Sequence, residues 1–407
     1  MAFTQRFAKH VLAVALALPL AASADDAPGT FKIPGTDSTI KLYGYVQLDA
    51  TYDFKGRDPN VEGNDWATIV PTLPFDSSQE TRNKPGHLYF TARTSRIGLQ
   101  TATPTRAGNV GVRLEGDFNA PNLEQGQTFT NSVGFRLRHA YGQASGGYGT
   151  LLVGQTWSTF LDLASVADTV DFNGPGSIAL LRNPMIRYQT PAFSGWQLAV
   201  AAENAPGTDG NDFSGASNIS KYQQIPDFVA NLSTGGAWGT FSVAASTLNF
   251  ARASATLGAP SYSKQGVAAS VSGSFKLAGD TIVAHVEGGS GVGRYLFNTL
   301  GNFGVDTGSS IFLSDAVAYH LGYTHVWNSE FRSNGVFSQT FIAPNAADVN
   351  QVGANHRIDQ VFANTFWTFA KNAEVGVEYI FGRRHTFGDD QEGTQHRLST
   401  SFHYNFF

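Results

Sequence analysis

Residues 374–382 read Glu-Val-Gly-Val-Glu-Tyr-Ile-Phe-Gly, and their side chains alternate between the two faces of an extended strand. The odd-numbered positions 375–381 are all Val, Tyr or Phe, whereas Glu374, Gly376 and Glu378 occupy the other face. The same rhythm recurs about sixteen times between Thr39 and Phe407. The chain is therefore predicted to be an all-β protein.

The length of these segments distinguishes a membrane barrel from a soluble sandwich. Several alternating segments run for about 11–16 residues, for example residues 39–54. Soluble strands average about 5–6 residues, whereas a tilted strand needs about 9–11 to cross the hydrocarbon layer. We predict a transmembrane antiparallel β-barrel of about 16 strands.

The first 24 residues have the features of a secretory signal peptide. Arg6 and Lys9 give a basic start, the following stretch to Leu20 is apolar, and Ala22-Ser23-Ala24 is a small-residue cleavage site. A short amphipathic helix is the alternative. We predict residues 1–24 as signal peptide, 25–38 as a short periplasmic segment and 39–407 as the barrel. No later apolar stretch approaches 18 residues, which argues against membrane-spanning helices.

Composition excludes several other classes of protein. Removing Arg6 and Lys9 from the 27 basic residues leaves 25 against 32 acidic ones, a net charge of −7, so nothing suggests a nucleic-acid partner. The chain has no cysteine, which removes disulfides and thiolate metal sites. The 44 glycines are spread along the chain and no linker interrupts it. One continuous barrel, without a cofactor or metal, fits these observations.

Short and long connections alternate along the chain. The seven short ones are Thr103–Gly108, Ser145–Gly149, Pro191–Gly195, Thr234–Gly239, Lys276–Asp280, Trp327–Glu330 and Ala370–Ala373. Short periplasmic turns and longer external loops are typical of bacterial outer-membrane barrels. Four of the six tryptophans, Trp196, Trp238, Trp327 and Trp367, lie at or near short turns, where indole rings favour the headgroup level. Ordinary core aromatics are the alternative explanation.

Residues 158–183 form an unusually apolar connection. Phe160, Leu163, Ala164, Ala167 and Val170 recur at helical spacing. An external loop of this character needs a surface to pack against, and the inner wall of the barrel is the nearest one. We expect this third external loop to fold inward and narrow the lumen, with Asp162, Asp168 and Asp171 available to face the channel. A cap over the barrel mouth is the alternative.

Three neighbouring strands place arginines on the predicted inner face. A bulge near Thr94-Ser95 would turn both Arg93 and Arg96 inward. Outward apolar residues in the next two strands, including Tyr141 in the fourth, leave five arginines inside at mid-depth: Arg93, Arg96, Arg113, Arg136 and Arg138. Segment 87–143 has six arginines, no lysine, two glutamates and one aspartate. Inward parity also places Arg187, Arg384 and Arg397 in the lumen.

Arginine stays charged and binds carboxylates through two parallel hydrogen bonds. A row of arginines in a water-filled pore raises the local concentration of anions and eases their passage. The structural alternative is that these side chains pair with Glu115, Asp117 or Asp49 and stiffen the wall. Both roles are compatible, because the arginines outnumber the neighbouring acids.

Several motifs together resemble a known family. They are Phe31-Lys-Ile-Pro-Gly-Thr-Asp, Ser95-Arg-Ile-Gly, Leu114-Glu-Gly-Asp-Phe118, Arg136-Leu-Arg-His-Ala-Tyr-Gly142 and Gly154-Gln-Thr-Trp-Ser-Thr-Phe160. In this order they resemble the DcaP-type porins of Gram-negative bacteria. The resemblance implies a sixteen-stranded homotrimeric barrel that takes up small anionic solutes, notably dicarboxylates and aromatic acids. The coiled coil that precedes the barrel in some members is not expected in residues 25–38.

We therefore predict an outer-membrane porin with an arginine-lined constriction. Its expected partners are outer-membrane lipid, small anionic solutes and the barrel assembly machinery, which reads a terminal aromatic strand such as residues 398–407. A surface receptor or adhesin is the main alternative. A barrel hydrolase is less favoured: no Gly-x-Ser-x-Gly elbow occurs, and His285, His320 and His403 lie on scattered strands without metal-ligand spacing. Gly149–Thr156 has phosphate-loop glycine spacing but Gln replaces the required Lys.

Overall fold

The computed structural model describes the two termini of the barrel and most of its wall. The described residues are 28–55, 86–120, 134–204, 214–215, 219–254, 261–296, 304–306, 309–343, 355–387 and 392–407. The predicted signal peptide lies outside them. Among these residues, no helix has the length and apolar character needed to cross a membrane.

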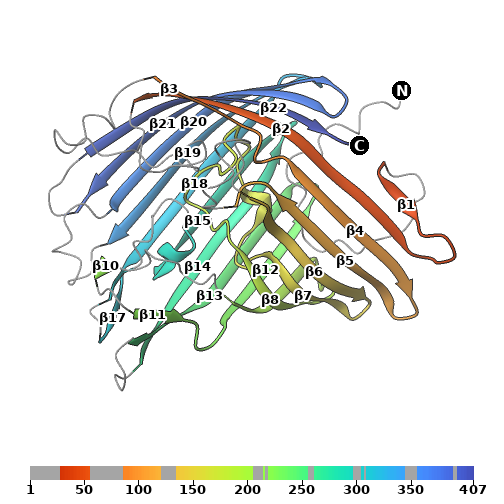
Figure 1. The fold of residues 1–407 in the computed structure, drawn as a ribbon, viewed down its shortest axis with the longest axis horizontal. Helices are drawn as coiled ribbons and strands as arrows, with labels where there is room; N and C mark the ends of the chain where they lie inside the picture. Colours follow the sequence, from red (N-terminus) through yellow and green to blue (C-terminus); the bar gives the residue numbers. More distant parts are fainter. Residues whose placement is uncertain are drawn as a thin grey trace.

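Long antiparallel strands make up the wall (Figure 1). The first half contains β1 (Thr30–Lys32), β2 (Thr39–Lys55), β3 (His87–Thr91), β4 (Arg96–Thr105), β5 (Gly108–Asp117), β6 (Arg136–Gly146), β7 (Gly149–Trp157), β8 (Arg182–Gln189), β9 (Trp196–Glu203), β10 (Ser214–Gly215), β11 (Ile219–Tyr222) and β12 (Asp227–Gly236). The second half contains β13 (Gly239–Ser254), β14 (Tyr262–Leu277), β15 (Asp280–Ser290), β16 (Gly304–Asp306), β17 (Ile311–Leu313), β18 (Asp315–Val326), β19 (Phe331–Ala343), β20 (Asn355–Ala370), β21 (Ala373–Thr386) and β22 (Glu392–Asn405). Two 3₁₀ turns, η2 (Leu163–Ser165) and η3 (Val292–Arg294), lie in connections.

The sheet closes on itself, because β2 pairs with β22 on one side and with β3 and β4 on the other. β3 and β4 are two parts of one strand, and β11 and β12 both pair with β13 and form another. β1 pairs with β2 alone and extends the sheet at one end. Counted in this way, the barrel has sixteen antiparallel strands, as predicted. A separate small sheet joins β10, β16 and β17.

All seven predicted short connections are turns between neighbouring strands. Five of them are two-residue turns, which join β4 to β5, β6 to β7, β12 to β13, β14 to β15 and β20 to β21. In the turn between β20 and β21, Asn372 has a φ of 68°, a left-handed conformation that asparagine tolerates better than most side chains. The seven turns and the longer connections alternate along the chain, which confirms the predicted up-and-down order of strands.

The outer face of the barrel is apolar, because every second residue of each strand points away from the lumen. Leu88, Ile97, Val153, Ile186 and Leu321 are all more than half exposed in the single chain. At the ends near short turns, Trp238, Trp327 and Trp367 are exposed by 46%, 64% and 45%. These side chains form a lipid-facing surface with aromatic rings at the turn end.

The third long connection, residues 158–181, folds into the barrel. Ala167 packs in a buried cluster with lumen-facing residues of four strands, among them Val283, Phe362 and Ile380. Phe160 is fully buried and its ring centroid lies 5.1 Å from that of Tyr295. The apolar side chains of the connection thus cover the inner wall, and the loop does not cap the barrel mouth. We call residues 158–181 the inner loop.

Two irregularities in the wall set the direction of the arginines. The break between β3 and β4, at residues 92–95, matches the predicted bulge near Thr94. A second bulge in β6 was not predicted: Leu137 pairs with Gly116 and His139 with Glu115, which leaves Arg138 as the extra residue. The bulge reverses the parity of the rest of β6. Tyr141 therefore pairs with Arg113 on the inner face, and its predicted outward orientation is wrong.

Candidate pore constriction

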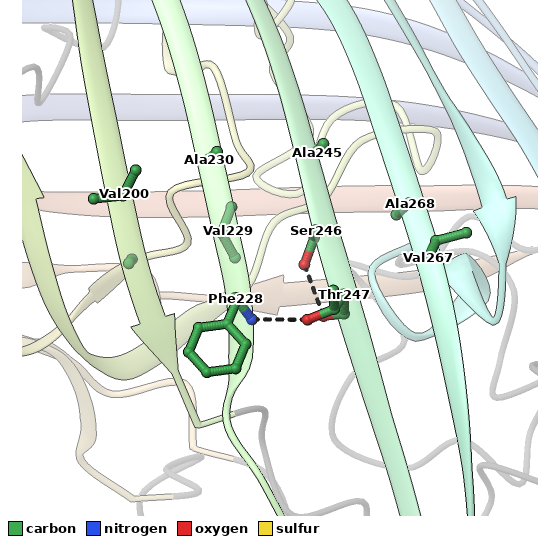
Figure 2. Close-up of a pocket in the computed structure, with 10 residues that line it drawn as sticks. Val200, Phe228, Val229, Ala230, Ala245, Ser246, Thr247, Val267 and Ala268 are labelled. Carbon is green, nitrogen blue, oxygen red and sulfur yellow. Dashed lines mark hydrogen bonds between the residues drawn. The ribbon is translucent and has the colours of Figure 1, made fainter.

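A shallow groove on the outside of β9 and β12–β14 is not the functional site. It has a volume of about 450 Å³ and is bordered by the exposed side chains of Val200, Phe228 and Val267 (Figure 2). The two hydrogen bonds drawn there run from the Phe228 backbone N–H to Thr247 Oγ1 and from Ser246 Oγ to the Thr247 carbonyl oxygen, both at 3.0 Å. The groove offers no charged group and belongs to the lipid-facing surface.

Charged side chains gather instead on the inner faces of β4, β5 and β6. Glu115 and Asp117, two residues apart on β5, point into the lumen and are 1% and 0% exposed. Arg113 Nη2 lies 2.7 Å from Glu115 Oε2, and Arg96 Nε lies 3.5 Å from Glu115 Oε1. Arg136 donates to both oxygens of Asp117, at 2.9 and 2.7 Å. These groups and Arg138 are called the arginine cluster.

Arg138 is the centre of the cluster. Its Nε donates to Glu115 Oε1 and its Nη1 to Asp117 Oδ2, both at 2.8 Å, so it links the two carboxylates. Its side chain is 3% exposed, whereas those of Arg96, Arg113 and Arg136 are 18%, 21% and 28% exposed. Four guanidinium groups surround two carboxylates, which leaves an excess of two positive charges. The three outer arginines present this excess to the lumen.

Aromatic rings hold the arginine side chains in place. Tyr43 donates its hydroxyl to Glu115 Oε2 at 3.0 Å and accepts from Arg113 Nε at 2.8 Å. The Arg96 guanidinium lies over the Tyr45 ring, 5.0 Å from its centroid. Such contacts stabilise a cation and restrict its rotamers. Both tyrosines come from the inner face of β2.

The inner loop reaches the arginine cluster through Phe172. Its ring centroid is 5.9 Å from the Arg136 guanidinium carbon and 5.6 Å from that of Arg138. The neighbouring residues Val170 and Asp171 donate their backbone N–H groups to Glu378 on β21, at 3.0 and 2.8 Å. The loop therefore touches both β6 and β21, and it narrows the lumen beside the arginines.

The other predicted arginines lie apart from this cluster. Arg93 is 3% exposed, and its guanidinium is 5.9 Å from the Tyr89 ring centroid. Arg397 is 1% exposed and forms two hydrogen bonds with Asp53, at 2.6 and 2.8 Å. Arg187 is half-buried on β8 opposite Leu152, and Arg384 is half-buried on β21 opposite Ile358 and Gly393.

The three aspartates of the inner loop differ in their surroundings. Asp162 caps η2 by accepting from Ala164 N, and its second oxygen accepts from Ser272 at 2.9 Å. Asp168 accepts from Arg332 Nε at 2.6 Å. Asp171 is 5% exposed, and burial, with a contribution from Glu378, raises the pKa of its carboxyl to about 8. All three lie against the wall that holds the loop.

Two further arginines, Arg182 and Arg332, make contacts in the lumen that the sequence did not predict. Arg182 lies next to the cluster, with its guanidinium 3.6 Å from the Trp157 centroid, and the same ring is 5.9 Å from Arg138. Arg332 on β19 bonds both Asp168 and Glu374. Arg182 and Trp157 are register neighbours on β7 and β8 but are separated in sequence by the inner loop. Only the strand pairing reveals their contact.

Buried histidines hold the inner loop. His320 Nε2 lies 2.8 Å from Ser165 O, and its Nδ1 lies 3.2 Å from Ser177 Oγ. Ser165 Oγ lies 3.5 Å from His285 Nδ1, and Glu287 lies 2.9 Å from the other nitrogen of that ring. This Ser–His–Glu order resembles a hydrolase triad, but Ser165 is 0% exposed beneath the loop. Within the described ranges, no group of three or more acidic or histidine side chains could hold a metal ion.

Comparison with known proteins agrees with this architecture. The family model described as DcaP outer membrane protein matches residues 12–406. The chain belongs to this family. The crystal structure of the outer membrane channel DcaP of Acinetobacter baumannii is 26% identical, with a TM-score of 0.75, over 92% of this chain and 99% of that one.

Other porins are also similar to this chain, in sequence or in fold. The porin Omp2b of Brucella suis is 28% identical over 227 residues, which is 53% of either chain. The chain thus spans about half the length of the curated relatives it matches. An anion-selective porin from Comamonas acidovorans is 13% identical, with a TM-score of 0.57, over 91% of this chain and all of that one. That similarity concerns the fold alone.

Proposed function

We propose that this protein is a passive outer-membrane channel that favours small anionic solutes, such as mono- and dicarboxylates. The observation that carries the proposal is the arginine cluster, where four guanidiniums outnumber two carboxylates beside the inner loop. Paired carboxylates fix the arginines in position, and the remaining positive charge lowers the energy of an anion in the lumen. The family and the barrel fold support a channel in the Gram-negative outer membrane.

The path that we propose runs between the inner loop and β4–β6. An anion would meet the exposed edges of Arg96, Arg113 and Arg136, whose guanidiniums can donate to a carboxylate in pairs. Arg138, 3% exposed, positions the two acids and contributes charge rather than contact. Export by residues 1–24, insertion through the C-terminal strand and homotrimer formation are parts of the same proposal: the first rests on the signal-peptide features of those residues, the second on the aromatic residues of the last strand, and the third on the family resemblance alone.

Reversal potentials in a planar bilayer test the proposal directly. With a KCl gradient across the wild-type channel, we expect chloride to be more permeant than potassium. Adding a dicarboxylate on one side should reduce chloride current in a concentration-dependent way, because both ions would use the same arginines. Preference for potassium would contradict the proposed selectivity. Absence of current steps from correctly folded protein would favour a receptor or adhesin.

A further inference from the structure

The outer faces of β18–β21 carry a row of polar side chains in an otherwise apolar surface. Tyr319, Gln339, Asp359 and Arg383 are successive register neighbours across the four strands. They share the outward parity of Val361, which is 41% exposed. Polar groups on a lipid-facing surface are unfavourable unless they lie near the headgroups or have partners. This row therefore needs a physical explanation.

Hydrogen bonds join the row and a fifth residue into one network. Tyr319 donates to the side-chain oxygen of Gln339, whose amide in turn donates to Asp359. Arg357 Nε donates to Asp359 Oδ1 at 2.8 Å. Arg383 donates to Asp359 Oδ2 from Nε at 3.0 Å and from Nη2 at 2.8 Å. One carboxylate, 6% exposed, thus holds two guanidiniums side by side.

The two guanidiniums keep donors for another acceptor. Among the described residues, neither terminal nitrogen of Arg357 nor Nη1 of Arg383 has a hydrogen-bond partner. Their side chains are 35% and 36% exposed. Two arginines and one carboxylate leave one net positive charge. Closer to the external end of these strands, the Glu392 carboxylate lies 3.5 Å from His385, so this neighbouring acid already has a partner. The free donors and the charge suit a phosphate, which arginine binds through two parallel bonds.

The depth of the network points to a lipid. Asp359 lies near the external end of β20, eight residues from Trp367 near its short-turn end. At a rise of about 3.3 Å per residue and a tilt of about 40°, eight residues span about 20 Å of membrane. The apolar band of such barrels is about 25 Å tall. The network thus lies at the outer headgroup level, with the exposed rings of Phe337 and Phe341 beside it.

We propose that Arg357 and Arg383, held together by Asp359, bind the phosphate of a phosphorylated lipid in the outer leaflet. Phe337 and Val361, which pair with each other one outward row deeper in the membrane than Gln339 and Asp359, would contact its acyl chains, and Phe341 lies 5.5 Å from the Arg357 guanidinium. The site is on the opposite side of the wall from the arginine cluster. It therefore adds a lipid-binding activity to the proposed channel and does not depend on the channel's selectivity.

Native mass spectrometry of the full chain in detergent tests the lipid site. The probes are a diphosphorylated lipid A, the same lipid without phosphates, and inorganic phosphate. We expect wild-type protein to retain the phosphorylated lipid, and the double variant Arg357→Gln/Arg383→Gln to bind it roughly tenfold more weakly or worse. Arg106→Gln, in the exposed turn between β4 and β5, is the matched control and should bind as wild type does.

Each other result has a defined meaning. Equal binding by the double variant, or equal affinity for the dephosphorylated lipid, would overturn the proposal. Competition by inorganic phosphate at similar concentration would assign the site to a free anion, and dissociation of oligomers in the double variant would assign it to a second copy. Heat-modifiable gel mobility establishes that each variant is folded. Single-channel selectivity should stay unchanged in the double variant, which separates this test from that of the proposed function.

Discussion

Two parts of the inner wall use charge in different ways. On β4–β6, four arginines share two carboxylates, and three of the guanidiniums remain partly open to the lumen. On β18–β21, Glu378 instead binds backbone N–H groups of the inner loop, and Arg332 is paired with Asp168 and Glu374. One part keeps net charge available for solutes. The other uses its polar groups to fix the loop that narrows the pore.

Changing the net charge of the arginine cluster, in either direction, should have the largest effect. Arg136→Gln/Arg138→Gln removes the excess of two positive charges, whereas Glu115→Gln/Asp117→Asn doubles it. Two charges about 8 Å from a passing ion in water change its energy by about 1 kcal/mol, a factor of roughly five in permeability. We expect the chloride-to-potassium ratio to fall in the first variant and to rise in the second. Reversal potentials in KCl gradients measure both.

The two variants control for each other, because each leaves a buried charged group without its partner. Similar ratios in both would mean that distortion of the wall, and not its charge, changes the current. A wild-type ratio in the arginine variant would assign Arg136 and Arg138 a structural role alone.

Sequence alternation was sufficient for the barrel but not for every detail of its lining. The period of two fixes which residues of β2 or β21 face lipid, and turn residues fix where strands reverse. A bulge reverses which residues of a strand face the lumen, and alternation alone does not show where a bulge occurs. The inward and outward faces of β6 therefore could not be assigned beyond Leu137, and Tyr141 was placed on the wrong face. Contacts of the inner loop with Glu378 or His320 join residues far apart in sequence, and no local pattern encodes them.

Releasing the inner loop from its wall should change conductance more than selectivity. Glu378→Ala removes the acceptor for Val170 N, Asp171 N and Asn364 Nδ2. A buried donor left without a partner costs about 1–3 kcal/mol, so the loop should lose order. We expect larger and noisier single-channel steps and a lower thermal midpoint. Glu330→Ala, in the exposed turn between β18 and β19, is the control, and equal behaviour of the two variants would contradict the assigned role of Glu378.

The pH dependence of the loop should follow Asp171. Its carboxyl, whose pKa burial raises to about 8, faces Glu378, Arg397 and Asp49. The raised pKa means that the docked loop binds a proton that the undocked loop, with a pKa of about 3.9, releases. Docking is therefore strongest below about pH 4 and weakens progressively as pH rises from about 4 to about 8, above which this carboxyl adds no further pH dependence. Current noise should increase between about pH 4 and 8 in wild type and then level off. Asp171→Asn should remove this increase, and persistence of the pH effect would place its origin elsewhere.

Shortening Phe172 should have the smallest effect and should separate size from charge. Phe172→Leu keeps an apolar side chain but removes the ring beside Arg136 and Arg138. A cation–π contact at a water-exposed site is worth about 0.5–1 kcal/mol, and the charges themselves remain. We therefore expect conductance to rise slightly while the chloride-to-potassium ratio changes by less than about twofold. If the ratio instead fell as far as in the arginine variant, the ring and not the net charge would set selectivity, because only the ring had been altered.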